Sequence, residues 1–212
     1  RAQQAETAQL ERQLDLHAQA LQQRIDRYRT LPQVLAQDPD LRDALAGPVD
    51  DTRRNALNQR LEDANSVTRS STLTLIDRRG IALAASNWRE PTSNVGEDYS
   101  FRPYVKQALR NGRGQFYGIG LTTGEPGYFL SQAIDGPDGD VAGLVVIKIE
   151  LDALEQEWLQ TPDIVLVSDA HGVIFLASRD GWRYRTLTAL SDADRRELAA
   201  TRQYARQRLT PL

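Results

Sequence analysis

The 212-residue sequence has no cysteine, no methionine and only two histidines. Without cysteine the chain has no disulfide framework, no thiol nucleophile and no thiolate metal site. It also lacks any apolar run of about 18 residues, which excludes a transmembrane helix within these residues. Because no initiating methionine is present and Arg1 already stands inside a helical pattern, we expect this sequence to be a piece of a longer protein.

The charge pattern argues against nucleic-acid binding, and the positions of the two histidines argue against catalysis and metal binding. The formal net charge is −3 and no basic tract is present, so nucleic acid is not an expected partner. His17 falls on the apolar face of a predicted helix and His171 in a predicted turn, and neither belongs to a nucleophile–base pair or a metal-binding motif. We therefore predict no enzymatic activity, no metal and no cofactor for this chain.

One hairpin pattern occurs twice, at residues 73–86 and 165–178. Each copy has an apolar strand, an Asp-x-x-Gly turn, a second apolar strand and a closing Ala-Ser. The aspartate bonds the backbone ahead of it and the glycine supplies a positive φ, which is typical of a β-hairpin. Coincidence is the alternative, but the matches share a single offset of 92 residues: Asp77 and Asp169, Gly80 and Gly172, Ser86 and Ser178. The repeat predicts two related α+β modules in tandem.

The region before the first hairpin has a helical pattern. Apolar residues spaced by three or four positions, from Leu10 to Leu31, form one face of a long helix that Pro32 is expected to kink or end. Two shorter helices are predicted at 39–46 and 52–67. We assign residues 1–67 to an N-terminal helical stalk.

The region after the first hairpin predicts one antiparallel sheet. It contains a short helix at 101–109 and strands at 115–119, 128–134 and 142–149. With the two strands of the hairpin these give a five-stranded sheet of the PAS-like plan. We assign residues 68–150 to this module.

The rest of the chain, residues 151–212, predicts a smaller PAS-like module. A connecting helix at 151–159 precedes the second hairpin, and a strand at 182–186 follows it. A final helix begins at Ser191, where Asp194 three residues later completes a capping box.

Two cationic residues of the first module are candidates for binding an anion. The chain has 24 arginines but only two lysines, and one of them, Lys148, interrupts an apolar strand on the same side as Leu144 and Val146. A buried ammonium needs an anionic partner or a route to water, so Lys148 either meets a ligand or reaches solvent past Glu150. Arg102 lies among aromatic residues, which either hold its guanidinium for a carboxylate or simply pack against it.

A turn rich in threonine and glycine lies between two of the predicted strands, at residues 122–127. Glycine lets a ligand approach the backbone, and the hydroxyls of Thr122 and Thr123 can bond an anion. The turn lacks the pattern of a phosphate-binding loop. Taken alone it is equally an ordinary hairpin turn.

The order of these features resembles a known family. The resemblance rests on Ser86-Asn-Trp88, on Tyr99-x-Phe-Arg-Pro-Tyr104, on Gly120-x-Thr-Thr-Gly-x-Pro-Gly-Tyr-Phe-Leu-Ser131, and on residues 182–187. From about Tyr28 onward the chain resembles the extracytoplasmic sensor region of DctB-type C4-dicarboxylate sensor histidine kinases. The resemblance implies a long N-terminal helix followed by a double PAS (double Cache) fold, with the ligand in the membrane-distal first module.

The resemblance also assigns roles to residues. Arg102 and Tyr99 would hold one carboxylate of a dicarboxylate, and Lys148, Thr122 and Thr123 would hold the other. Further candidates for lining the site are Tyr117, Tyr128 and Ser131. Asn94 and Val105 depart from the bulkier residues expected there, which leaves succinate, malate, fumarate and an oxo-acid such as 2-oxoglutarate as alternatives.

The resemblance finally implies a place in the cell and a set of partners. The chain would be the periplasmic part of an inner-membrane histidine kinase, flanked by transmembrane helices outside this sequence. A response regulator would be the partner of the kinase region. The competing hypothesis is a structural module without a ligand, in which the long helix pairs with a second copy to form a homodimer.

Overall fold

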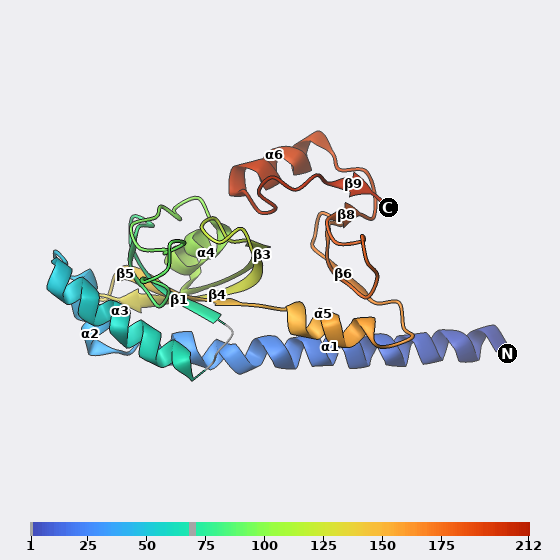
Figure 1. The fold of residues 1–212 in the computed structure, drawn as a ribbon, viewed down its shortest axis with the longest axis horizontal. Helices are drawn as coiled ribbons and strands as arrows, with labels where there is room; N and C mark the ends of the chain where they lie inside the picture. Colours follow the sequence, from blue (N-terminus) through green and yellow to red (C-terminus); the bar gives the residue numbers. More distant parts are fainter. Residues whose placement is uncertain (1, 68–70) are drawn as a thin grey trace.

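The computed structural model describes residues 2–67 and 71–212, and its α+β architecture agrees with the prediction (Figure 1). Its centre is a five-stranded antiparallel sheet in the order β2-β1-β5-β4-β3. The strands are β1 (Ser71–Asp77), β2 (Ala82–Ala85), β3 (Arg113–Ile119), β4 (Pro126–Asp135) and β5 (Val141–Ile149). The boundary expected at residues 67 and 68 falls at the gap in the described part, and the division into modules stays a prediction.

The two faces of this sheet carry two separate clusters of apolar side chains. Leu73 and Ile147 belong to a large cluster that includes residues of the N-terminal helices and of the second module. Leu144 and Val146 point to the opposite face and join a smaller, aromatic cluster with residues of α4 (Pro103–Asn111). The alternation of side chains along a strand therefore fixes which residues can face α4 and the loops beside it.

The N-terminal helix α1 spans Ala2–Leu35 and continues past Pro32, where we expected it to kink or end. Proline removes one backbone donor from the helix, but its carbonyl still accepts from Ala36 N at 2.9 Å. Leu35 and Ala36 are buried in the large cluster. This packing offsets the missing donor, so the helix makes its last turn after the proline. None of the described helices is long and apolar enough to cross a membrane.

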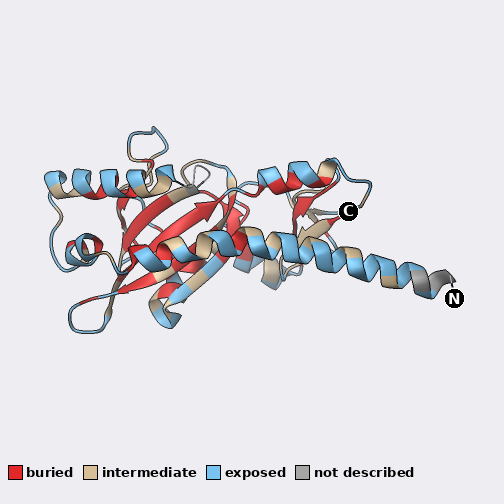
Figure 2. Ribbon diagram, turned by 90° about the horizontal axis from the view of Figure 1, so that it is seen from below, coloured by how far each residue is buried: buried red, intermediate tan, exposed pale blue. Residues whose placement is uncertain are grey.

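The first half of α1 extends beyond the sheet, and most of the described residues in this half are exposed (Figure 2). Leu10 and Leu14, on the predicted apolar face, are 61% and 64% exposed, whereas Ile25 is buried. His17 lies edge-on to Trp158 at 5.7 Å between ring centroids, so this part of α1 packs beside the connecting helix α5 (Asp152–Leu159). Pairing of α1 with a second copy stays a prediction.

Two capped helices complete the N-terminal region. They are α2 (Pro39–Leu45) and α3 (Asp51–Ser66), close to the predicted ranges. The carboxylate of Asp50 accepts from Arg53 N at 2.7 Å, which satisfies one of the unpaired donors at the start of α3. α3 packs on β1 and β2, and α1 packs on β4 and β5, so these helices cover one face of the sheet.

The second module contains less regular structure than the first. After the connecting helix α5, its elements are β6 (Leu166–Ser168), β7 (Ile174–Ala177), β8 (Arg185–Thr186), α6 (Asp192–Thr201) and β9 (Thr210–Pro211). β6 pairs with β7, and β8 pairs in parallel with β9, as two-stranded sheets. The capping box predicted at Ser191 and Asp194 is confirmed.

The strand predicted at 182–186 is reduced to Arg185–Thr186. Trp182 and Arg185 form a turn in which Arg185 N bonds to Trp182 O at 3.0 Å, and Tyr184 has a φ of 68°. A positive φ is incompatible with an extended strand. The aromatic residues Trp182 and Tyr184 and the β-branched Thr186 are typical of a strand, but the backbone turns there.

The duplicated turn supplies a matched test of the fold. Gly80 and Gly172 have φ values of 91° and 76°, so alanine strains both, at a cost of about 1 to 2 kcal/mol. A Cβ at Gly80 would also lie 2.5 Å from the Cα of Ser100, whereas at Gly172 its nearest contact would be Leu187 at 3.6 Å. We predict that Gly80→Ala lowers the free energy of unfolding by about 1 to 3 kcal/mol more than Gly172→Ala, measured by urea denaturation. Equal losses would contradict the packing described here.

Candidate functional site

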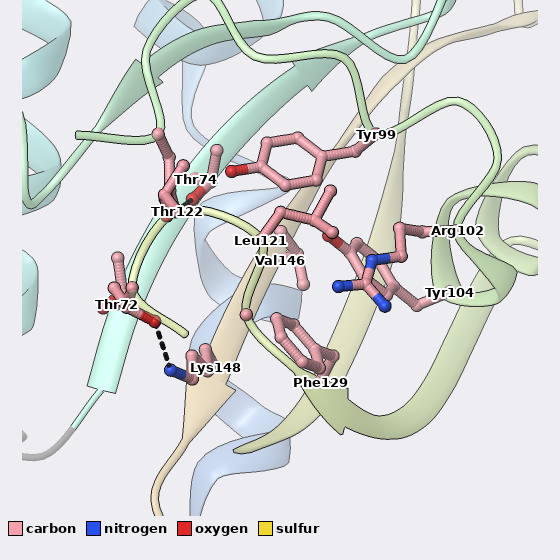
Figure 3. A pocket seen from close by; sticks show the side chains of 13 residues that line it. Thr72, Thr74, Tyr99, Arg102, Tyr104, Leu121, Thr122, Phe129, Val146 and Lys148 are labelled. Carbon is pink, nitrogen blue, oxygen red and sulfur yellow. Dashed lines mark hydrogen bonds between the residues drawn. The ribbon is translucent and has the colours of Figure 1, made fainter. Parts of the chain in front are cut away.

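A small cavity lies on the α4 side of the sheet, at one end of β1 and β5. Its walls come from these strands, from β4, from the loop after β3 and from the loop that leads into α4 (Figure 3). Its volume is about 20 Å³, roughly the room that one water molecule needs. Five predicted ligand-binding residues line it: Tyr99, Arg102, Thr122, Thr123 and Lys148.

Lys148 reaches the cavity from β5, on the same side as Val146, as the alternation predicted. It is only 8% exposed, and its ammonium donates to the hydroxyl of Thr123 at 3.1 Å. Burial lowers the pKa of Lys148, and the negative charges of Glu150 and Glu125 partly oppose this effect. No ion pair between Lys148 and a carboxylate is recorded among the described residues.

Two glycines, one in the loop after β3 and one at the start of β4, make room for this lysine. A Cβ at Gly127 would lie 2.6 Å from the Cε of Lys148, and a Cβ at Gly120 would lie 3.3 Å from its Nζ. Any larger residue at Gly127 would displace the side chain. Gly127, at the end of the predicted turn, and Gly120, just before it, therefore leave the space that Lys148 occupies.

Arg102 is the N-cap residue of α4, and it is 1% exposed. Its guanidinium lies 5.5 Å from the ring centre of Phe116 and donates to three backbone carbonyls. Two of these are Thr201 O at 3.2 Å and Arg202 O at 3.1 Å, and the third is Ile119 O. The Nε atom is buried without a partner in the described structure. Burial lowers the pKa of Arg102, but a guanidinium stays charged at neutral pH.

A polar network lies beside the two cations. Asn94 donates from Nδ2 to the hydroxyl of Thr74 at 2.9 Å, and its Oδ1 accepts from Thr122 at 2.7 Å. Tyr99 lines the cavity beside this network. Burial raises the pKa of Tyr99 to about 12, so its hydroxyl keeps its proton at neutral pH. The network thus connects β1 to the loop after β3.

Three predicted residues lie elsewhere. Tyr117 stacks on Phe175 of the second module at 4.1 Å between ring centroids, and its hydroxyl donates to Phe175 O. Tyr128 packs with the cluster beneath the N-terminal helices. Ser131 donates to Tyr104 O at 2.8 Å. Because none of these three is part of the cavity wall, we leave them out of the proposed site.

Sequence reasoning missed several residues of the wall. Thr72 and Thr74 are polar residues at alternate positions of β1, a signal that was available in the sequence. Asn94 was noted only for its difference from the expected family pattern. The apolar part of the wall consists of Leu121, Phe129 and Val146.

The chemistry of the cavity favours an anion with two charged ends. Two buried cations line it, and no carboxylate pairs with either of them in the described part of the chain. The hydroxyls of Tyr99 and Thr123 add neutral donors beside the charges. No described group of histidine, cysteine, aspartate and glutamate side chains forms a metal site.

Comparisons with known proteins point to one family. No protein-family model matches the chain. The C4-dicarboxylate transport sensor protein DctB of Rhizobium meliloti (strain 1021) is 36% identical over 93% of this chain, and that of Pseudomonas aeruginosa is 34% identical over 94%. The chain spans 31% and 32% of the length of these two relatives.

A solved structure extends the likeness to the fold. The sensor domain of the Vibrio cholerae histidine kinase DctB has a TM-score of 0.90 and 28% sequence identity. The match covers 99% of this chain and 81% of that one. The resemblance noted in the sequence, including the double Cache fold, is therefore confirmed.

The burial of Lys148 yields a prediction for stability. Its pKa is lower in the folded chain than the ordinary 10.5, so burial of the charge destabilises the fold at pH values below the lowered pKa. We predict that Lys148→Met raises the free energy of unfolding by about 1 kcal/mol at neutral pH. The gain should shrink as the pH rises through the lowered pKa towards 10.5, because the wild-type lysine then loses its charge.

The measurement is urea denaturation at several pH values without added carboxylic acids. Lys106→Met is the control, because Lys106 is the other lysine and is exposed on α4. A loss of stability in Lys148→Met at neutral pH would contradict the account.

Proposed function

Because this chain belongs to the DctB family of C4-dicarboxylate sensor proteins, we propose that its cavity binds a small dicarboxylate such as succinate, malate or fumarate. The observation that carries the proposal is the presence of Arg102 and Lys148 in one cavity wall, each buried and neither paired with a carboxylate in the described structure. The chain is the periplasmic sensor domain of a membrane histidine kinase, and is not itself an enzyme. It signals across the membrane to the kinase region and its response regulator.

One carboxylate of the ligand lies at Arg102. The three recorded bonds occupy three of the five N–H donors of the guanidinium, and the Nε donor is unpartnered. A carboxylate that accepts from Nε and from the remaining Nη hydrogen forms a charge-assisted, bidentate contact. The protonated hydroxyl of Tyr99 is a further donor on the same wall.

The other carboxylate lies at Lys148 and Thr123. The Thr123 hydroxyl accepts from Lys148 Nζ at 3.1 Å and from Glu125 N at 3.3 Å, so its own proton can be donated to a ligand. Thr122, by contrast, donates its proton to Asn94. Thr123 is therefore the better placed of the two threonines.

The cavity must widen to take such a ligand, because a space of about 20 Å³ has room for about one water molecule and a dicarboxylate of four carbons is larger. The loop between β3 and β4 is the part of the wall best suited to move. It contains Gly120 and Gly124, and Gly124 has no neighbour within 4 Å of where a Cβ would stand. Movement of this loop would carry Thr122 and Thr123 with it.

Calorimetric titration of the domain with succinate tests the proposal. We predict that Lys148→Met weakens succinate binding about 30- to 150-fold, the equivalent of about 2 to 3 kcal/mol for a lost charge-assisted contact. Butyrate, which has one carboxylate, should bind the wild-type domain much more weakly than succinate, and the variant should largely lose this preference.

Lys106→Met is the matched control, since it removes the chain's other lysine from an exposed position. It should bind succinate as tightly as the wild type. No binding of any dicarboxylate or oxo-dicarboxylate, 2-oxoglutarate included, would contradict the proposed function.

A further inference from the structure

The end of α6, in the second module, docks on the edge strand of the first module's sheet. Ile119 N, at the end of β3, donates to Gln203 O at 2.8 Å. The side chain of Gln203 donates back to Tyr117 O at 3.0 Å, and it is 9% exposed. Residues 201–204, the α6 end segment, therefore continue the hydrogen bonding of β3 where the sheet would otherwise stop.

The same segment supplies most of the partners of Arg102. Thr201 O and Arg202 O are two of the three acceptors of its guanidinium, at sequence separations of 99 and 100 residues. These carbonyls stand at the C-terminal end of α6, where the helix dipole places partial negative charge. A buried guanidinium without an ion pair depends on such partners.

We propose that the α6 end segment positions Arg102 for the ligand, so that the second module completes the binding site of the first. The inference rests on the proposed function, because it takes the ligand to be a carboxylate at Arg102. With Nη1 held by the two carbonyls of α6, the guanidinium keeps one orientation, and its unpartnered Nε is left to bind the ligand.

Ligand binding and docking of the segment then strengthen each other. A carboxylate at Nε neutralises the buried charge and favours the rotamer that also bonds α6. Docking of the segment in turn favours the orientation that the ligand needs. The coupling is reciprocal because both events stabilise the same position of one side chain.

A second anchor holds the segment within its own module. The hydroxyl of Tyr204 donates to Asp169 Oδ2 at 2.6 Å, and Asp169 is the first residue of the second Asp-x-x-Gly turn. Oδ1 of the same carboxylate accepts from His171 N and Val173 N, both at 2.9 Å. The turn therefore fixes the place from which the segment reaches Arg102.

Gln203→Ala tests the inference, because Gln203 holds the segment to β3 and is not part of the cavity wall. Titration of the whole domain with succinate should show at least a fivefold loss of affinity in this variant. Ile174→Val is the control, since it trims a buried residue of β7, elsewhere in the second module, and should stay within twofold of the wild type. Tyr204→Phe is the second variant if Gln203→Ala does not fold, with the same expected direction.

Amide hydrogen exchange gives a readout that general destabilisation would not produce. Succinate should slow exchange of the Ile119 amide, which bonds the segment, more than that of the Ser178 amide, which bonds Val165 O within the second module. If the wild type binds succinate and both Gln203→Ala and Tyr204→Phe bind it equally well, this inference is wrong and the proposed function stands. Equal protection of the two amides would have the same meaning. No binding by the wild-type domain would overturn the proposed function and this inference with it.

Discussion

The burial of Arg102 without an ion pair is the constraint on which the site and its surroundings depend. Its guanidinium is 1% exposed, and in the described structure its recorded acceptors are backbone carbonyls rather than a carboxylate. Such a charge is unfavourable unless several oriented dipoles surround it. The chain provides them from the end of β3 and from the end of α6, two elements of different modules. A binding residue of the first module is thus held in place largely by the second.

The two copies of the Asp-x-x-Gly turn have diverged around this arrangement. In the first copy, Asp77 bonds the backbone of its own turn and the side chain of Arg79, and it takes no part in the contact with α6. In the second copy, the equivalent Asp169 bonds Tyr204 of the α6 end segment. The same turn closes a hairpin in both modules, and in the second module it also anchors the segment that contacts the first module. Only the first module carries the two buried cations of the cavity.

Much of the sheet could be predicted because alternation of side chains is a local property. It placed Lys148 on the side of Val146, and the turn residues marked the ends of β3, β4 and β5. Alternation also explains why Tyr128 does not line the cavity. Its neighbour Phe129 lines the cavity, so Tyr128 faces the helices on the other side of the sheet.

Tertiary packing decided the features that the sequence did not reveal. Pro32 lies within a helix because the residues after it are buried, and the segment before Arg185 turns although its composition suits a strand. Two of the three acceptors of Arg102 lie 99 and 100 residues away, and the hydrogen bonds of Asn94 join a strand to a loop. No spacing along the chain predicts such contacts, because they depend on how separate elements dock.

The central claim is that one carboxylate lies at Arg102 and the other at Lys148, with α6 still bonded to Arg102. A crystal structure of the domain grown with succinate tests it most directly. The account predicts one carboxylate within hydrogen-bond distance of Arg102 Nε, the other at Lys148 and Thr123, and the Thr201 and Arg202 carbonyls still in contact with the guanidinium. A dicarboxylate bound elsewhere, or one at Arg102 with the end of α6 released, would contradict it.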